Sequence, residues 1–296
     1  MSQRIRKAVF PVAGLGTRFL PITKTFPKEM LPLIDKPLIQ YSVEEALASG
    51  IEQLIFITGR GQSAIENYFD YAPELNYMLK SKGCMKELEI VNASVFEPGT
   101  ITYLRQQFPL GLGHAIWCAR HLIGDEPFAV LLPDDFIQSE KPCLQQMIEV
   151  YQDHQNSLLA VMEVPIAETQ HYGILDVKSK ENNRIYAKGL VEKPLPNKAP
   201  SCYAVVGRYI LTPDIFEKLD KQEKGQNNEI QLTDAIAKTI KGNSLCGLLF
   251  EGERYDCGNK KGMLDAIISL ALKREDLKVE VQKFFLKDSR HVYGNY

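Results

Sequence analysis

Short apolar runs alternate with segments of helical periodicity over the first half of this 296-residue chain. The apolar runs predict strands at residues 7–12, 53–58, 101–106 and 128–132, and the periodic segments predict helices at 38–49, 62–69, 114–122 and 142–154. A helix between two strands lets those strands lie parallel. The pattern therefore predicts an α/β fold with a mixed, mainly parallel sheet that helices cover on both faces. In such sheets, ligands bind at the carboxyl ends of the strands.

The pattern changes toward shorter strands at about residue 158. Strands are predicted at 158–164, 173–177, 204–210 and 245–250, with a proline- and lysine-rich loop at 192–200. Residues 72–97 predict a helical insertion. No linker separates the two parts, so we expect one domain over residues 1–296, with halves of about 1–157 and 158–296.

An apolar stripe at helical spacing runs along the C-terminal segment. Its members are Leu264, Ile267, Ile268, Ala271 and Leu272, extended by Leu277, Val281, Phe284 and Phe285. Packing of this stripe on its own domain is the simplest interpretation. For Phe284 and Phe285, a contact with a second subunit is an equal alternative.

Glycines, prolines and basic residues gather directly after the first predicted strand, in the segment VFPVAGLGTRFLPITKTFPKEMLP. Gly14 and Gly16 allow a tight turn that brings backbone N–H groups close to an anion. Arg18 and Lys28 add positive charge for phosphate oxygens, and Lys24 lies nearby. The prolines oppose helical hydrogen bonds, so we expect an open loop. Together these features predict a site for a nucleoside triphosphate.

Two common phosphate-binding motifs do not fit this loop. A Walker A loop requires Lys followed by Ser or Thr at a set distance from the first glycine, and the pair Lys24-Thr25 comes too late. A dinucleotide-binding fingerprint requires a third glycine at the position of Phe19. An NAD-dependent oxidoreductase is therefore disfavoured.

Composition excludes several other classes of protein. The net charge of −2 and the absence of a long basic run argue against nucleic-acid and membrane-surface partners. No apolar run has the length of a membrane span or of a signal peptide. The six cysteines form no C-x-x-C pair, which favours reduced thiols. We interpret His114 and His121 as packing or surface residues and not as zinc ligands, and we expect a cytoplasmic protein.

Several motifs occur in one order along nearly the whole chain. They are G-x-G-T-R-x-x-P from Gly14, P-K-E-M-L-P from Pro27, T-G-R-G at 58–61, G-L-G-H-A at 111–115, L-P-D at 132–134, Y-G at 172–173, V-E-K-P at 191–194, E-I-Q-L-T-D at 229–234 and Y-D-C-G at 255–258. In this set and order, the chain resembles the sugar-1-phosphate nucleotidylyltransferases.

The resemblance implies a Rossmann-like nucleotide-diphospho-sugar transferase fold, with nucleotide bound by the first half and sugar bound by the second. It implies transfer of a uridylyl group from UTP to glucose 1-phosphate with Mg²⁺, giving UDP-glucose and pyrophosphate, and it implies a homo-oligomer. Two alternatives stay open: a related transferase that uses dTTP or another sugar phosphate, and a non-catalytic regulatory subunit on the same fold. Arg18, Lys28 and Asp134 together argue against a subunit without turnover.

This chemistry sets modest demands on the protein. The attacking sugar phosphate already carries nearly two negative charges, so the protein need supply neither a nucleophile nor a strong base. Repulsion between the two anions is the main obstacle, and catalysis should depend on positioning and on cations.

The resemblance also assigns roles to residues that match the motifs. Arg18 and Lys28 would be catalytic, because they would stabilise the triphosphate and the departing pyrophosphate. The nucleotide would be held by Ala13, Gly14, Gly16, Gln106, Gly111 and Gly113. Glycine backbone at the last two positions would lie close to base and ribose, and the amide of Gln106 can both donate to and accept from the uracil edge. The sugar phosphate would be held by Gly173, Glu192, Lys193 and Gly207. The Mg²⁺ ligand would be Asp134, joined by Asp256.

Adjacent side chains on an extended strand point in opposite directions. Asp134 and Asp135 should therefore not reach the same ion unless the chain turns there, and Asp135 is otherwise expected in a turn or cap. For Asp256, a metal ligand and a helix cap are both open. By the same alternation, Glu192 would contact sugar hydroxyls while Lys193 would meet the phosphate of the same ligand.

Overall fold

The computed structural model describes residues 4–225, 228–240 and 245–292, with side chains described as far as residue 287. In these ranges, no helix combines the length and the apolar character needed to cross a bilayer. All six cysteines are free thiols. A cytoplasmic location stays a prediction.

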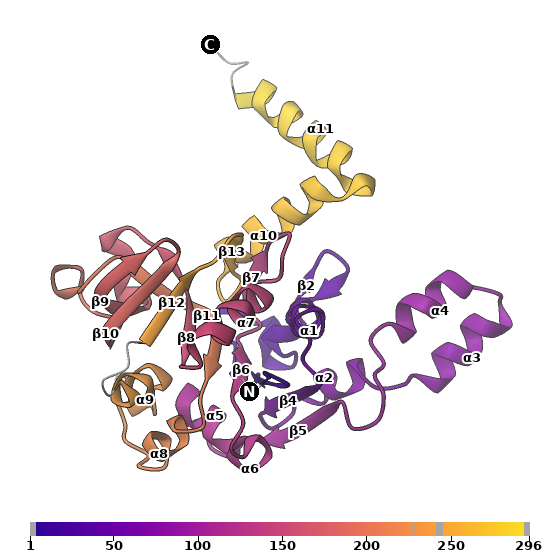
Figure 1. Ribbon diagram of the computed structural model, residues 1–296. Coiled ribbons are helices and arrows are strands. Elements are labelled where there is room, and N and C mark those ends of the chain that lie inside the picture. The colour runs from indigo at the N-terminus through magenta and orange to yellow at the C-terminus, as the bar shows by residue number, and fades with distance from the viewer. Residues whose placement is uncertain (1–3, 226–227, 241–244, 293–296) are drawn as a thin grey trace.

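The first half of the chain builds four parallel strands and their covering helices (Figure 1). The strands are β1 (Lys7–Pro11), β4 (Gln53–Thr58), β5 (Ile101–Arg105) and β6 (Phe128–Leu131), and the helices are α1 (Leu38–Ala48), α2 (Ser63–Tyr68), α5 (Leu112–Cys118), α6 (Arg120–Ile123) and α7 (Cys143–His154). The predicted elements are confirmed with small shifts at their ends. The one helix predicted at 114–122 is divided into α5 and α6.

The second half contributes longer strands, so the predicted change toward shorter strands is wrong. They are β8 (Leu158–Glu163), β9 (Gly173–Glu181), β10 (Arg184–Glu192), β11 (Tyr203–Leu211) and β12 (Leu245–Leu249), with helices α8 (Ile215–Leu219), α9 (Leu232–Thr239), α10 (Lys260–Lys273) and α11 (Glu275–Val292). Four of these strands confirm the sequence-based predictions, whereas β10 was not predicted.

The nine strands named above lie in one sheet with the order β5-β4-β1-β6-β11-β8-β12-β10-β9. β1, β4, β5 and β6 pair in parallel, and so do β8 and β12. β11 runs antiparallel to β6 and β8, and β10 runs antiparallel to β12 and β9. The predicted α/β fold with a mixed sheet is confirmed, and its parallel part lies mainly in the first half. The domain limits themselves stay a prediction.

Helices cover both faces of the sheet, as neighbouring residues of β1 illustrate. Phe10 is buried in one core with Phe56, at a ring-centroid distance of 5.0 Å, and with side chains of α1 and α7. Val9 is buried in the opposite core with Ile55 and side chains of α5. This alternation follows from the two-residue period of a strand, and it explains why the strands of the first half read as continuous apolar runs.

Two small sheets lie outside the main one. β2 (Pro32–Leu33) pairs with β3 (Lys36–Pro37), and β7 (Asp135–Gln138) pairs antiparallel with β13 (Glu253–Asp256). In the second pair, Asp135 stands opposite Asp256. The pairing thus brings together two carboxylates that are far apart in the sequence.

Two helical segments project from the body of the molecule (Figure 1). One is a hairpin of α3 (Pro73–Ser81) and α4 (Met85–Asn92), which confirms the predicted insertion. The other is α11, which leaves the body after α10. Within the C-terminal stripe, Ala271 is buried whereas Leu264 of α10 and Phe284 and Phe285 of α11 are exposed. A subunit contact through the two phenylalanines stays a prediction.

Candidate active site

The glycine-proline segment follows β1, and Asp134 follows β6, which is the neighbour of β1 in the sheet. Because β1 and β6 are parallel, both segments leave the sheet at the same edge. The structure therefore brings them to the edge at which the sequence predicted a ligand site.

The glycine-proline segment is not the open loop that the sequence predicted. It folds into three single-turn 3₁₀ helices, η1 (Thr17–Phe19), η2 (Ile22–Lys24) and η3 (Lys28–Met30). Prolines oppose the α-helical hydrogen-bond ladder, but Pro21 and Pro27 stand directly before η2 and η3, where a missing N–H costs nothing. Gly16 adopts a left-handed φ of 61°, and its carbonyl accepts a 2.7 Å hydrogen bond from Thr23 Oγ1. The fold of the segment is thus fixed by its own contacts.

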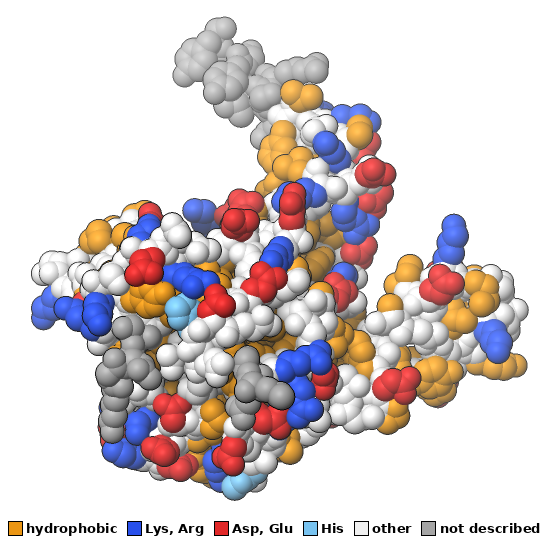
Figure 2. Space-filling model, in the orientation of Figure 1, with side chains coloured by type: hydrophobic (Ala, Val, Ile, Leu, Met, Phe, Trp, Pro, Cys, Tyr) orange, Lys and Arg blue, Asp and Glu red, His pale blue; other side chains and the backbone are white. Residues whose placement is uncertain are grey.

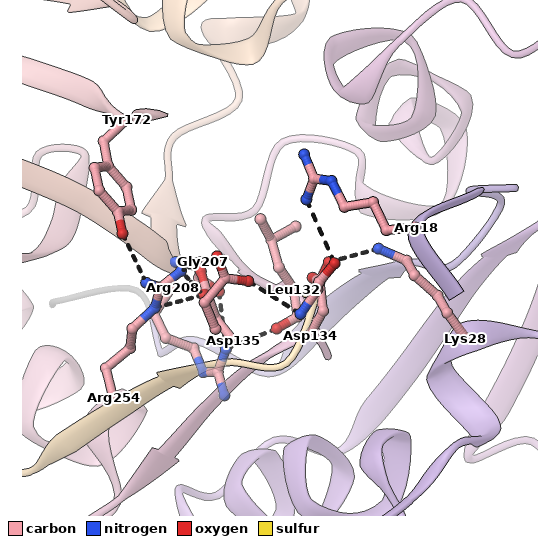
Figure 3. Close-up of polar contacts among 11 residues, drawn as sticks. Arg18, Lys28, Leu132, Asp134, Asp135, Tyr172, Gly207, Arg208 and Arg254 are labelled. Carbon is pink, nitrogen blue, oxygen red and sulfur yellow. Dashed lines mark hydrogen bonds and ion pairs between the residues drawn. The ribbon is translucent and has the colours of Figure 1, made fainter. Parts of the chain in front are cut away.

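Lys28 points its amine toward Asp134 (Figure 3). Its Nζ is 2.5 Å from Asp134 Oδ2. Burial would lower the pKa of Lys28, but the charge of Asp134 and its hydrogen bond outweigh burial and raise it. Burial would raise the pKa of Asp134, but Lys28 outweighs burial and lowers it. Both groups are therefore charged at neutral pH.

Glu29 is a buried carboxyl group that sequence reasoning missed. Its side chain is 1% exposed, and its Oε1 lies 3.9 Å from Lys28 Nζ. Its Oε2 has no hydrogen-bond partner among the described residues. Burial raises the pKa of Glu29 to about 8, although Lys28 opposes the shift. The P-K-E-M-L-P motif was its only sequence signal, because a glutamate that directly follows a lysine does not itself indicate burial.

Arg18 reaches the same place from η1. Its Nη1 donates to the Gly258 carbonyl at 3.4 Å, and Figure 3 shows its guanidinium on the same side of Asp134 as Lys28. Lys24 is exposed and no polar contact of its side chain is found among the described residues. The structure thus brings together Arg18 and Lys28 but not Lys24.

Asp134 and Asp256 face a common space beside Gly258. A Cβ atom on Gly258 would lie 3.0 Å from Asp134 Oδ2 and 3.0 Å from Asp256 Oδ1, so these oxygens are at most 6.0 Å apart, twice that distance. Asp256 is not the cap of α10, because Asn259 occupies that position and accepts a 2.9 Å hydrogen bond from Gly262 N. Of the two interpretations of Asp256, the structure removes the helix cap.

Asp135 serves a different purpose from Asp134. The chain turns before it, with Asp135 N donating to Leu132 O at 3.1 Å. Its Oδ2 accepts a 2.6 Å hydrogen bond from Gly207 N, and its Oδ1 accepts from Arg254. Asp135 thus holds protein groups together, while Asp134 faces the cations.

Arg208 supports this turn from behind. Its guanidinium is 1% exposed and pairs with Glu45 at 2.8 Å. Its Nη1 donates to Leu132 O and to Gly207 O, each at 3.0 Å. The segment that carries Asp134 is therefore anchored to both α1 and β11.

A pocket of about 530 Å³ lies over the glycine-proline segment. Its lining includes Ala13, Gly14, Gly16, Lys28, Gln106, Gly111 and Asp134, so it gathers every predicted nucleotide-binding residue except Gly113. A Cβ on Gly113 would lie 2.8 Å from Ile230 O, and one on Gly111 would lie 2.9 Å from the same oxygen. Close packing of the protein chain therefore requires glycine at both positions, a cause that sequence reasoning missed.

Gln106 is held in a fixed orientation at this pocket. Its Nε2 donates to Gly111 O at 3.1 Å and lies 2.9 Å from His114 Nδ1. Burial, and to a lesser degree Arg120, lowers the pKa of His114, so a neutral imidazole can accept this bond. Both amide hydrogens of Gln106 are then used within the protein, and its Oε1 is left as an acceptor. This narrows the prediction that Gln106 both donates and accepts.

A second pocket, of about 740 Å³, lies beside the first. Its lining includes Arg18, Tyr172, Gly173, Glu192, Lys193, Gly207, Arg254 and Asp256. All four residues predicted to hold the sugar phosphate are therefore brought together. Leu112, Leu132 and Glu229 line both pockets, so the two pockets share a wall.

Two details of the second pocket contradict the sequence-based predictions. Glu192 and Lys193 do not diverge, because Lys193 has a left-handed φ of 45° and its Nζ lies 3.2 Å from Glu192 Oε1. Gly207 has no free backbone group for a sugar, because its N–H donates to Asp135 and its carbonyl accepts from Leu132 N. Glycine is required there because a Cβ would lie 2.6 Å from Leu132 Cβ.

A family model described as nucleotidyl transferase matches residues 7–272. The chain belongs to the nucleotidyl transferase family. Among curated members of this family, it is 48% identical over 282 residues to the UTP–glucose-1-phosphate uridylyltransferase of Bacillus subtilis (strain 168), covering 95% of this chain and 96% of that protein. A protein of the same name from Staphylococcus epidermidis (strain ATCC 12228) is 47% identical over 282 residues, covering 95% of this chain and 98% of that one.

Solved structures of nucleotidyl transferases agree with this fold. A UDP-glucose pyrophosphorylase complexed with UDP-glucose has a TM-score of 0.81 at 45% identity, covering 91% of this chain and all (100%) of that one. A UTP-bound enzyme from Acinetobacter baumannii has a TM-score of 0.87 at 40% identity, covering 95% and 99% of the two chains. The resemblance derived from the motifs is confirmed.

Proposed function

We propose that this protein transfers a uridylyl group from UTP to glucose 1-phosphate, releasing pyrophosphate and forming UDP-glucose. The observation that carries this proposal is the meeting of two pockets at one cationic centre. One pocket contains Gln106, the glycine-rich turn, Lys28 and Asp134, and the other contains Glu192, Lys193, Arg18 and Asp256. Asp134 and Asp256 face the same space beside Gly258, so the two pockets meet there. The names of relatives at 47% and 48% identity support the choice of UTP and glucose 1-phosphate.

The residues at the junction fit in-line attack of one phosphate ester on another. The sugar phosphate supplies the nucleophilic oxygen, which attacks the α-phosphorus of UTP while pyrophosphate leaves on the opposite side. Lys28 stays charged because its pKa is raised, so it can stabilise the charge that develops on the phosphate oxygens. The hydrogen bond of Arg18 to a neutral carbonyl leaves its charge available for the departing pyrophosphate.

Asp134 and Asp256 would hold Mg²⁺. The space between them is kept open by the missing side chain of Gly258, and the pKa of Asp134 is lowered, so that its carboxylate is ionised. Within the described residues, no group of three or more His, Cys, Asp or Glu side chains is arranged to hold a metal. This fits Mg²⁺, which is usually bound by one or two carboxylates, phosphate oxygens and water. When bound, the ion would neutralise charge on the phosphates.

A pyrophosphate-release assay across several nucleoside triphosphates and sugar 1-phosphates tests the proposed function. We expect the highest kcat/KM for UTP with glucose 1-phosphate and no release without Mg²⁺. Higher kcat/KM with dTTP or with another sugar phosphate would favour the related transferase. No release with any pair, from protein that binds nucleotide, would favour a regulatory subunit.

Two substitutions test the assigned roles. We expect Lys28→Ala and Asp134→Ala each to lower kcat about 100-fold or more, the range seen when one charge-stabilising group is lost. Lys86→Ala on the exposed surface of α4 is the matched control for loss of a lysine. Near-normal turnover in either active-site variant, with an unchanged circular dichroism spectrum, would refute its role.

We also propose that the protein forms a homo-oligomer. Exposed apolar side chains gather on the two projecting helical segments, and Figure 2 shows them on both. On the hairpin they include Tyr77 and Ile90, which are 79% and 74% exposed, and on α11 they include Phe284 at 67%. Apolar patches of this kind mark interaction surfaces. Light scattering tests the proposal, and a monomer at assay concentration would refute it.

A further inference from the structure

Arg254 lies in the wall of the second pocket and holds two segments of that wall together, through Asp135 and Tyr172. It lies in β13, and its side chain is 10% exposed. Figure 3 shows it between Asp135 on one side and Tyr172 on the other. A guanidinium buried to this degree is retained only with several partners, because removing its charge from water is costly.

On the metal side, Arg254 fixes Asp135. Nε donates to Asp135 Oδ1 at 2.6 Å and Nη2 donates to the same oxygen. Since Gly207 N occupies Oδ2, both oxygens of this carboxylate are used. Asp135 is thereby held away from Asp134, and the turn that carries Asp134 is fixed to β13. Asp256 lies on the same strand, with its Oδ2 3.9 Å from Arg254 Nη2.

Arg254 also holds the segment that would bind the sugar phosphate. Nη1 donates to Tyr172 Oη at 3.2 Å, and the guanidinium carbon lies 5.4 Å from the centre of the Tyr172 ring. The carbonyl of Tyr172 accepts a 3.0 Å hydrogen bond from Lys193 N. A chain of two hydrogen bonds therefore connects Arg254 to the backbone of Lys193.

The shape of the side chain suits this double attachment. A guanidinium presents its donors in a rigid planar fork, so one edge can hold Asp135 while another holds Tyr172. A lysine ammonium is a single point and cannot span both partners in that way. Burial would lower the pKa of Arg254, but the charges of Asp135 and Asp256 outweigh it and raise the pKa, so the group is always charged.

We infer that Arg254 is a positioning residue, which sets the location of the bound sugar phosphate relative to the metal-side carboxylates through Tyr172 and Asp135. The inference rests on the proposed function. It assigns Arg254 no contact with a reacting atom. Its loss should affect ligands that occupy the second pocket and spare ligands that occupy only the first.

Calorimetric binding of UDP-glucose and of UTP separates these two cases, because UDP-glucose extends into the second pocket and UTP does not. Tyr172→Phe removes one hydroxyl and keeps the ring. We expect this variant to bind UDP-glucose about tenfold more weakly, the lower end of the effect of one hydrogen bond to a charged group, and to bind UTP as the wild type does. Tyr71→Phe, at an exposed position before α3, is the matched control.

A double-mutant cycle tests whether Tyr172 acts through Arg254. We expect Arg254→Lys to show the same selective loss, and Tyr172→Phe to add less than about twofold in that background, because coupled partners are not additive. In steady-state kinetics, the KM for glucose 1-phosphate should rise more than the KM for UTP. If Arg254→Lys does not fold, Tyr172→Phe alone decides.

Three results would overturn the inference: unchanged UDP-glucose affinity in Tyr172→Phe, equal weakening of UTP and UDP-glucose, or additive effects of the two substitutions. Measurements on the wild type show whether the inference alone fails or the proposed function fails too. Wild type that binds neither ligand and releases no pyrophosphate would refute the function itself, whereas an active wild type with an unaffected Tyr172→Phe variant would refute only the positioning role.

Discussion

The buried carboxyl group of Glu29 makes a strong prediction about the pH dependence of stability. We consider Glu29→Gln, which keeps the shape of the side chain and removes its ability to ionise. Burial raises the pKa of this group from its ordinary value of 4.5 to about 8. The folded protein therefore keeps the proton in a pH range in which the unfolded chain has lost it.

The sign and size of the effect follow from proton linkage. Below about pH 4.5 the carboxyl is protonated in both states and stability is unaffected. As pH rises toward about 8, ionisation stabilises only the unfolded chain, so the wild type loses stability. The loss is complete above the folded pKa. At 1.36 kcal/mol per pKa unit, the difference between 4.5 and about 8 amounts to about 5 kcal/mol.

Urea unfolding of the ligand-free protein, in the presence of a chelator, measures this effect. The free energy of unfolding would be compared between Glu29→Gln and wild type at about pH 5 and about pH 9. We expect the difference, variant minus wild type, to rise by several kcal/mol over that range. Other titrating groups cancel in the difference.

Glu87→Gln, at an exposed position on α4, controls for loss of one negative charge. A difference between Glu29→Gln and wild type that stays constant within about 0.5 kcal/mol, less than a typical single-site effect, would refute the reasoning. It would mean that Glu29 is ionised in the folded protein and is stabilised by Lys28 more strongly than its burial disfavours it.

Two further predictions use the region around Gln106. Gly113→Ala would place a Cβ 2.8 Å from Ile230 O. We expect the free energy of unfolding, measured in urea, to fall by about 1–3 kcal/mol. Unchanged stability would mean that the neighbouring chain moves to make room for the methyl group. Trp117 is the one tryptophan in the sequence and stacks on His114 at 5.6 Å, and His114 contacts Gln106. The fluorescence of Trp117 should change when UTP is added and not when glucose 1-phosphate alone is added. No change at saturating UTP would contradict the placement of the base.

The sequence predicted the strands of the first half well because both faces of those strands are buried. The bounds of β4 coincide with the predicted residues 53–58, since its apolar run ends where burial ends. β10 was missed because arginine and lysine interrupt its sequence, RIYAKGLVE, and it lies next to the edge strand β9, where one side of the sheet can be polar.

The candidate site was predictable where motifs carried it and not where distant residues complete it. Arg254 and Asp135 are 119 positions apart, and neither charge signals that it will be buried against the other. The ion pair between Glu192 and Lys193 depends on one left-handed φ angle, which no alternation rule anticipates for a lysine. Glu29 likewise needed the packed structure, because its burial is not a local property.

The place of β11 between β6 and β8 has a consequence for biosynthesis. β6 leads directly into Asp134, yet one of its two neighbours, β11, spans Tyr203–Leu211 and emerges from the ribosome later than the whole of the first half. Until then the nascent chain carries an unpaired β6 edge, to which a chaperone or another copy can add a strand. The carboxylate that follows β6 gains its anchors, Gly207 and Arg208, only when β11 has been made.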